Sequence, residues 1–333
     1  MTLHIYQAHL LHYISEDDLA KRTAAELSDT RIPDFLVNLT VDKDTTLLPV
    51  IAGVRVYPEY IADGALVIDD ETGLIINYGS REAMLANYVL TATNDSQEPV
   101  QIHDHRHKLI MPGFIDTHVH YPQIDMIAAY GEQLLDWLNN YTFVTEANFG
   151  DPKIAHDTAQ FFLNQLLANG TTSAMVFATS HPLSAEAFFA ESHRLNTRMI
   201  TGNVLMDQNA PEPLCVPAEQ SIRDTQNIID NWHERGRQHV AITPRFAITS
   251  SPTQLRLAGE LYTSHDSVYL QTHLAENRDE VAFVQELYPN HKGYLDVYDD
   301  MGLLGHRTTL AHGIYLETPE YERLRETGTQ ISH

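Results

Sequence analysis

From Met111 onward, short apolar segments of strand character alternate with longer amphipathic segments of helical character. This alternation is the sequence pattern of βα units and predicts a parallel sheet. One amphipathic segment, Ile154 to Leu167, ends shortly before Gly170, a residue type that often closes a helix. The candidate strands are residues 113–119, 172–179, 198–205, 239–246, 268–275, 308–314 and 328–333. Strand starts separated by helices in this way predict an α/β fold of the (β/α)₈ barrel type.

The first 110 residues have a different pattern, with short strand-like runs. Two such runs, 65–68 and 74–77, flank the turn sequence Asp-Asp-Glu-Thr-Gly and predict a β-hairpin. We therefore expect a small β-rich domain over residues 1–110 and a barrel domain over residues 111–333. We interpret the barrel as truncated after about its seventh strand, because an open barrel leaves unpaired backbone groups along its edges. No role is assigned to the acidic stretch 29–60.

The charge and cysteine content exclude several classes of protein. With 45 acidic and 21 basic residues, the formal net charge is −24, which works against binding DNA, RNA or an acidic membrane and favours a small neutral substrate. Cys215 is the only cysteine, so a disulfide within the chain and a cysteine-rich zinc site are excluded, including that of the small zinc deaminases. Because the sequence has neither a signal-peptide pattern nor a membrane-spanning apolar run, we expect a cytoplasmic protein.

Histidines stand at the ends of three candidate strands. His118 and His120 close the first of them, and on a strand alternate side chains share a face, so both imidazoles could bind one divalent metal. His273 and His312 close two later strands, and the carboxyl ends of barrel strands meet at one face. Taken singly, each has an ordinary alternative: a chance pair among 19 histidines, or a core histidine bonded to the backbone.

Glu276 follows His273 at the spacing His-x-x-Glu, where the chain turns toward the next helix. An imidazole can hold a metal while a carboxylate three residues later transfers a proton to or from the substrate. The alternative is a surface glutamate at the start of a helix, where the helix dipole favours a negative charge.

Arg245 and Phe246 together close the fourth candidate strand. A guanidinium group beside an aromatic ring could hold a planar substrate that forms hydrogen bonds. The alternative is a surface arginine next to a core phenylalanine. For the amphipathic run from Leu134 to Leu138, we predict core packing in preference to a pocket wall.

These segments together resemble the amidohydrolase superfamily over about residues 105–333, and within it most closely the members that deaminate guanine. The resemblance is carried by the sequences LIMPGFIDTHVHYPQ (109–123), YGEQLLDWL (130–138), NGTT (169–172), ITPRF (242–246), THLAEN (272–277) and LAH (310–312). It implies a distorted (β/α)₈ barrel with a small β-sandwich built from the chain ends, and a homodimer.

The resemblance also implies a metal site with one zinc ion per chain. Its ligand positions fall on four histidines: His118, His120, His273 and His312. A fifth ligand, an aspartate after an eighth strand, has no counterpart in this sequence. The metal identity stays open from the residues alone, because imidazole ligands accept iron as well as zinc.

The implied reaction is the hydrolytic deamination of guanine to xanthine and ammonia, in which zinc activates a water molecule for attack at C2. Glu276 is the implied proton shuttle. Arg245 would donate to the O6 carbonyl of the purine and so disfavour adenine, which carries an amino donor there. The implied substrate-binding residues are His120, Gln123, Arg245, Phe246 and His273.

Two alternatives to this function remain at the level of sequence. One is a barrel hydrolase with the same metal site that acts on another aminated heterocycle, such as a triazine or a pterin. The other is a metal-binding remnant that is inactive because the last strand and its aspartate are missing.

Overall fold

The structure is a computed structural model, and it describes residues 2–15, 18, 50–51, 54–90, 100–131 and 133–333. The chain divides into two compact units, Met1–Pro112 and Gly113–His333, two residues beyond the boundary that we expected. Each unit is described by itself. Most of the acidic stretch 29–60 lies outside the described residues.

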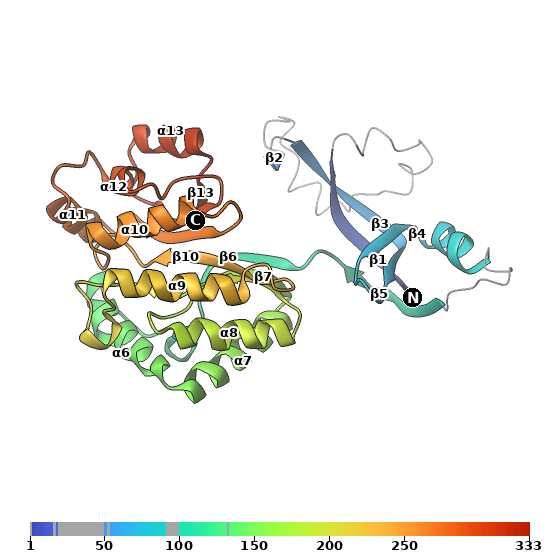
Figure 1. Ribbon diagram of the computed structural model, residues 1–333. Helices are drawn as coiled ribbons and strands as arrows, with labels where there is room; N and C mark the ends of the chain where they lie inside the picture. Colours follow the sequence, from blue (N-terminus) through green and yellow to red (C-terminus); the bar gives the residue numbers. More distant parts are fainter. Residues whose placement is uncertain (1, 16–17, 19–49, 52–53, 91–99, 132) are drawn as a thin grey trace. The chain divides into compact units, whose positions relative to one another are not determined.

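The N-terminal unit contains a five-stranded sheet in the order β2-β3-β1-β5, with β4 paired to β3 (Figure 1). Strand β1 is antiparallel to β3 and parallel to β5. The predicted hairpin is confirmed: β3 and β4 pair antiparallel, with Leu66 opposite Tyr78. The strands are β1 Leu3–Ser15, β2 Val50–Ile51, β3 Val54–Asp69, β4 Ile75–Ser80 and β5 Val100–Ile110. A second sheet facing this one, as in a complete sandwich, is not present among the described residues.

One face of this sheet carries a small apolar core. Alternate residues of β1 and β3, among them Ile5, Ala65 and Val67, are fully buried there with Met84. Met84 belongs to the helical segment that follows β4, made of α4 Arg81–Leu85 and the π-helix η2 Ala86–Leu90. The side-chain period of two along a strand thus places one apolar row under this segment.

The C-terminal unit is a nearly closed barrel of parallel strands, as predicted, in the order β6-β7-β8-β10-β11-β12-β13 (Figure 1). The third candidate strand is interrupted at Gly202 and Asn203, and at Gly202 a side chain would collide with the carbonyl oxygen of Ala241. It forms two strands, β8 and β9, and both pair with β10. The strands are β6 Phe114–His120, β7 Thr171–Phe177, β8 Arg198–Thr201, β9 Val204–Leu205, β10 His239–Pro244, β11 Tyr269–Leu274, β12 Thr308–His312 and β13 Gln330–Ser332.

Helices connect these strands, and α7, α8 and α9 pack against β7, β8 and β10, respectively. The predicted helix is α7, which begins after the capping residue Asp151 and is followed by Gly170 in the left-handed conformation, with φ of 84°. The α-helices are α5 Leu134–Trp137, α6 Phe143–Glu146, α7 Pro152–Ala168, α8 Pro182–Arg194, α9 Ala218–Trp232, α10 Pro252–Thr263, α11 Arg278–Leu287, α12 Tyr294–Asp300 and α13 Thr318–Thr327. The shorter turns are the 3₁₀-helices η3 Tyr121–Met126, η5 Ala147–Gly150 and η6 Glu212–Leu214, and the π-helix η4 Leu138–Thr142.

The barrel unit has one large apolar core, in which Phe177, Phe188, Phe189 and Leu205 are fully buried. This core fixes the strand ends from which the site is built. Across the part of the chain that the structure describes, no helix combines the length and apolarity needed to span a membrane.

Candidate active site

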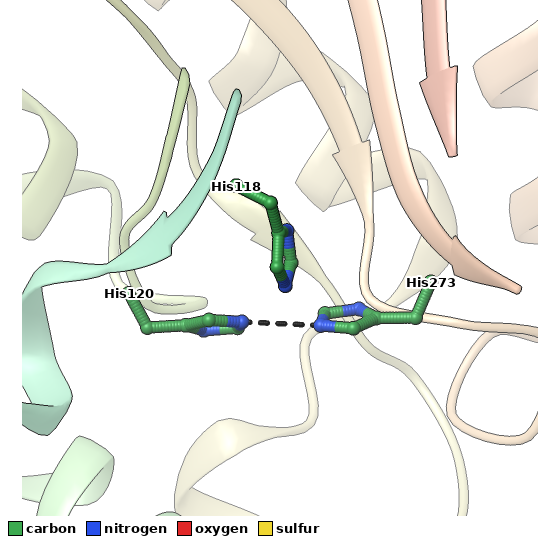
Figure 2. A group of neighbouring side chains, drawn as sticks. All are labelled: His118, His120 and His273. Carbon is green, nitrogen blue, oxygen red and sulfur yellow. Dashed lines mark hydrogen bonds between the residues drawn. The ribbon is translucent and has the colours of Figure 1, made fainter. Parts of the chain in front are cut away.

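Three histidine side chains converge inside the barrel unit (Figure 2). His118 and His120 come from the end of β6, and His273 comes from β11. One ligating nitrogen from each lies within 4.8 Å of the others, and the Nε2 atoms of His120 and His273 are 3.1 Å apart. Two strands that are distant in the sequence thus bring together three of the four predicted metal ligands.

The strand β6, which carries His118 and His120, is irregular where it pairs with β7. The register with β7 shifts between Asp116 and Val119, where three steps along β6 match two along β7. Such a bulge redirects side chains and is common beside active sites. Both rings point toward His273, which is what their alternate positions predicted (Figure 2).

The protonation state of this cluster suits a metal. The Nδ1 atom of His273 lies 2.7 Å from the backbone oxygen of Arg245, so the proton sits on Nδ1 and the lone pair on Nε2 faces the other rings. Burial holds the pKa of His120 and of His273 well below the usual value, and it lowers the pKa of His118 to about 3. Neutral imidazoles with free lone pairs are the form that binds a divalent metal.

Phe177, the last residue of β7, packs against all three rings. Its ring centroid lies 5.1 Å from that of His118 and 4.6 Å from those of His120 and His273. The side chain is fully buried. Sequence reasoning missed this residue, because an apolar residue at the end of an apolar strand has the pattern of ordinary core.

His312, the fourth predicted ligand, lies beside the cluster without entering it. Its ring stacks on that of His273 with centroids 5.6 Å apart, while its Nε2 atom is 3.3 Å from a carboxylate oxygen of Glu276. Its backbone is left-handed, with φ of 76°. That conformation costs a residue other than glycine about 1–2 kcal/mol, and strain of this kind gathers at functional sites.

Glu276 lies between β11 and α11, and its side chain faces the cavity that the histidines line. Burial, and to a lesser extent the nearby carboxyl of Glu280, raise its pKa to about 7 against the opposing effect of Arg245. The backbone N–H groups of Glu276 and Asn277 donate to the Glu280 carboxylate at 2.8 and 3.0 Å. The surface-glutamate alternative is therefore wrong, because Glu276 is partly buried against His312 and Glu280 is the glutamate that caps the helix.

All eight residues predicted for the site line one cavity of about 160 Å³. Our prediction for the run from Leu134 to Leu138 was incomplete. Its side chains pack on the core as expected, but three of them also form a wall of the cavity, where the helix changes to the π-helix η4. The lining residues are His118, His120, Gln123, Leu134, Trp137, Leu138, Arg245, Phe246, His273, Glu276 and His312.

A buried carboxylate that the sequence did not indicate holds two of these residues. The Arg245 Nη1 group donates to Glu146 Oε2 at 2.6 Å, and the Gln123 amide donates to Glu146 Oε1 at 3.2 Å. Arg245 is 2% exposed, so the surface-arginine alternative is wrong, while Phe246 is buried as well as lining the cavity. The guanidinium carbon also lies 5.1 Å from the ring centroid of Phe143.

Comparison with known proteins agrees with this geometry. Residues 109–333 match the model of the amidohydrolase family. The guanine deaminase of Escherichia coli strain K12 is 45% identical over 275 residues, which cover 83% of this chain and 62% of that protein. The chain therefore spans less than two thirds of the length of that relative.

Solved structures give the same result. The structure of E. coli guanine deaminase matches with a TM-score of 0.80 and 39% identity, over 98% of this chain and 66% of that one. A guanine deaminase from C. acetobutylicum, with guanine bound in its active site, matches with a TM-score of 0.75 and 27% identity, over 99% of this chain and 67% of that one.

Proposed function

Since this chain belongs to the amidohydrolase family, we propose that it catalyses the hydrolytic deamination of guanine to xanthine and ammonia. The observation that carries the proposal is the convergence of three neutral imidazoles and Glu276 on a cavity that Arg245 and Gln123 also line. The names of the E. coli relative and of the C. acetobutylicum structure with bound guanine support guanine as the substrate.

The donor set fits a divalent metal, since the lone pair of His273 is directed by its bond to Arg245 and the three ligating nitrogens are close together. We propose zinc as that metal, held by His118, His120 and His273 with His312 as the adjoining fourth imidazole. Such a metal lowers the pKa of a bound water and so supplies the nucleophile at neutral pH. The cytoplasmic location and the homodimer remain predictions from the sequence.

Glu276 is the proposed proton shuttle. A carboxyl group with a pKa of about 7 can both accept and donate a proton near neutral pH, which is the property that general acid–base catalysis needs. It would take a proton from the attacking water and deliver it to the ring nitrogen beside C2. The second proton, left on the oxygen that came from the water, would pass to the amino group, so that the C2–N bond breaks, ammonia leaves and a carbonyl group remains at C2.

The side of the cavity formed by Arg245, Gln123 and Phe246 would bind the purine edge. Arg245 would donate to the O6 carbonyl, and Phe246 would lie against the flat base. Adenine carries an amino group at the position of O6. The buried N–H group of Arg245 would then face another donor, which would weaken binding by about 1–3 kcal/mol. Guanine is therefore the purine that this side accepts.

The test is turnover by the metal-loaded chain, with guanine, adenine, an aminotriazine and a pterin supplied separately. We expect guanine to give xanthine and ammonia in equal amounts, and the other compounds to react at least 100-fold more slowly. Failure to convert guanine would refute the proposal, and faster conversion of the triazine or the pterin would favour the other aminated heterocycles.

A further inference from the structure

Glu146 is the carboxylate that connects the two polar residues on the substrate side of the cavity. It ends α6 and has no exposed surface. Each of its oxygens has a different partner: Oε2 accepts from Arg245 and Oε1 accepts from Gln123. Glu146 itself does not line the cavity, so it acts on a substrate only through these two side chains.

The contact with Glu146 fixes which end of the Gln123 amide is free. A carboxylate can only accept hydrogen bonds, so the amide must turn its nitrogen toward Glu146. The carbonyl oxygen of Gln123 is then the end without a bond to Glu146, and Gln123 lines the cavity. Gln123 therefore offers an acceptor to a bound molecule.

Arg245 offers donors beside that acceptor. Its Nη1 group is bonded to Glu146 and its guanidinium lies over the Phe143 ring, which together hold the side chain in one place. The other N–H groups of its guanidinium can still donate hydrogen bonds to a bound molecule, and an arginine side chain has no acceptor. Because both partners sit on one carboxylate, the acceptor of Gln123 and the donors of Arg245 are neighbours.

We infer that Glu146 is a positioning residue that sets the polarity of hydrogen bonding in the cavity. It holds Gln123 with its oxygen free and Arg245 with its donors free, so that the cavity matches a ring N–H next to a carbonyl group, as on the N1–O6 edge of guanine. This inference rests on the proposed function for its substrate. With a glutamine at position 146, the amide could donate to the Gln123 oxygen, and Gln123 could then present its nitrogen instead.

The test compares guanine with 2,6-diaminopurine, which has the same 2-amino group but an acceptor at N1 and a donor at position 6. The variants are Glu146→Gln and, as the matched control, Glu191→Gln, which removes a buried carboxylate paired with Arg194 on α8. Binding is followed by tryptophan fluorescence, because Trp137 lines the cavity, and turnover is measured in parallel.

We expect Glu146→Gln to reduce the preference for guanine over 2,6-diaminopurine at least tenfold, both in binding and in kcat/KM, while Glu191→Gln keeps the wild-type preference. Glu146→Asp keeps the buried charge but is too short to hold both partners. Glu146→Asp should reduce the preference for guanine over 2,6-diaminopurine at least threefold. If Glu146→Gln does not fold, this variant tests the inference in its place.

An unchanged preference in folded Glu146 variants would overturn the inference, whatever happens to overall activity. So would a wild-type protein that makes xanthine yet binds both purines equally, in which case the proposed function stands. A wild type that binds guanine selectively without converting it would refute the proposed function alone, since the preference measured by binding still tests Glu146.

Discussion

At the scale of single residues, Arg245 connects the histidine cluster with Glu146, the residue proposed to position the substrate contacts. Its backbone oxygen accepts from His273 Nδ1, and its guanidinium is held by Glu146. The residue that directly follows β10 therefore orients a proposed metal ligand through its backbone and offers donors through its side chain. A change in the backbone conformation at Arg245 would disturb both the hydrogen bond to His273 and the position of the guanidinium.

The first prediction concerns Glu276. We expect Glu276→Gln to keep its metal, because the imidazole ligands are unchanged, and to lose turnover by about 10²–10⁴-fold, the usual contribution of a general acid–base group. The measurements are kcat with guanine and metal content by elemental analysis.

Glu286→Gln is the matched control, since Glu286 is an exposed glutamate on α11, the helix that follows Glu276. It should retain wild-type kcat. Turnover by Glu276→Gln within threefold of the wild type would remove Glu276 from the mechanism.

The residues of the site were predictable where their chemistry is unusual for their position. Histidines at strand ends stand out, and so does a His-x-x-Glu spacing. Glu146 and Phe177 could not be predicted, because a glutamate in a helical segment usually faces water and a phenylalanine ending an apolar strand is usually core. The bond between Glu146 and Arg245 joins positions 99 residues apart, a pairing that only the fold creates.

At the scale of elements, glycine is required where the backbones of two segments approach each other closely. In α10, Gly259 is buried against the chain that follows α12, and a methyl group there would collide with the backbone oxygen of Met301. Because the obstacle is backbone, no side-chain rotation can relieve it.

We therefore predict that Gly259→Ala destabilises the barrel unit, although alanine is the better helix former. Overpacking of this kind costs about 1–3 kcal/mol, which exceeds the roughly 0.5–1 kcal/mol gained in helix propensity. The measurement is the free energy of unfolding in urea. Thr253→Ala, an exposed change in the same helix, should stay within about 0.5 kcal/mol of the wild type. Equal stability of the two variants would contradict the predicted collision.

The strands and helices themselves were largely predictable, because the spacing of apolar residues along the sequence differs between a strand and a helix. The break of the third strand at Gly202 and Asn203 was not predicted, and the close approach of Ala241 to Gly202 is a contact that only the fold creates. The π-helix η4 was also not predictable. Its first residue, Leu138, is both part of the apolar core and part of the cavity wall.

At the scale of the whole molecule, the acidic charge and the buried site are separate features. The formal charge of −24 belongs to a chain whose cavity holds neutral imidazoles and an arginine paired with a glutamate. A small uncharged molecule can enter such a cavity without desolvating an unpaired charge, which is costly in a protein interior.

Removal of the proposed metal should destabilise the chain, because that metal would bind the folded ligand set and not the unfolded chain. At a free zinc concentration a thousandfold above Kd, binding contributes ~4 kcal/mol, and a chelator should remove it. The measurement is the melting temperature with zinc and with chelator. His118→Ala should lose this dependence and His156→Ala, an exposed histidine on α7, should keep it. A wild-type melting temperature that is the same with zinc and with chelator would contradict the proposed metal site.

The most direct test of the central claim is the mass of the xanthine that the metal-loaded chain makes from guanine in ¹⁸O-labelled water. Hydrolytic deamination at C2 replaces the amino group by one oxygen from water, so the account predicts xanthine that is heavier by one ¹⁸O. No xanthine, or xanthine without the label, would contradict it.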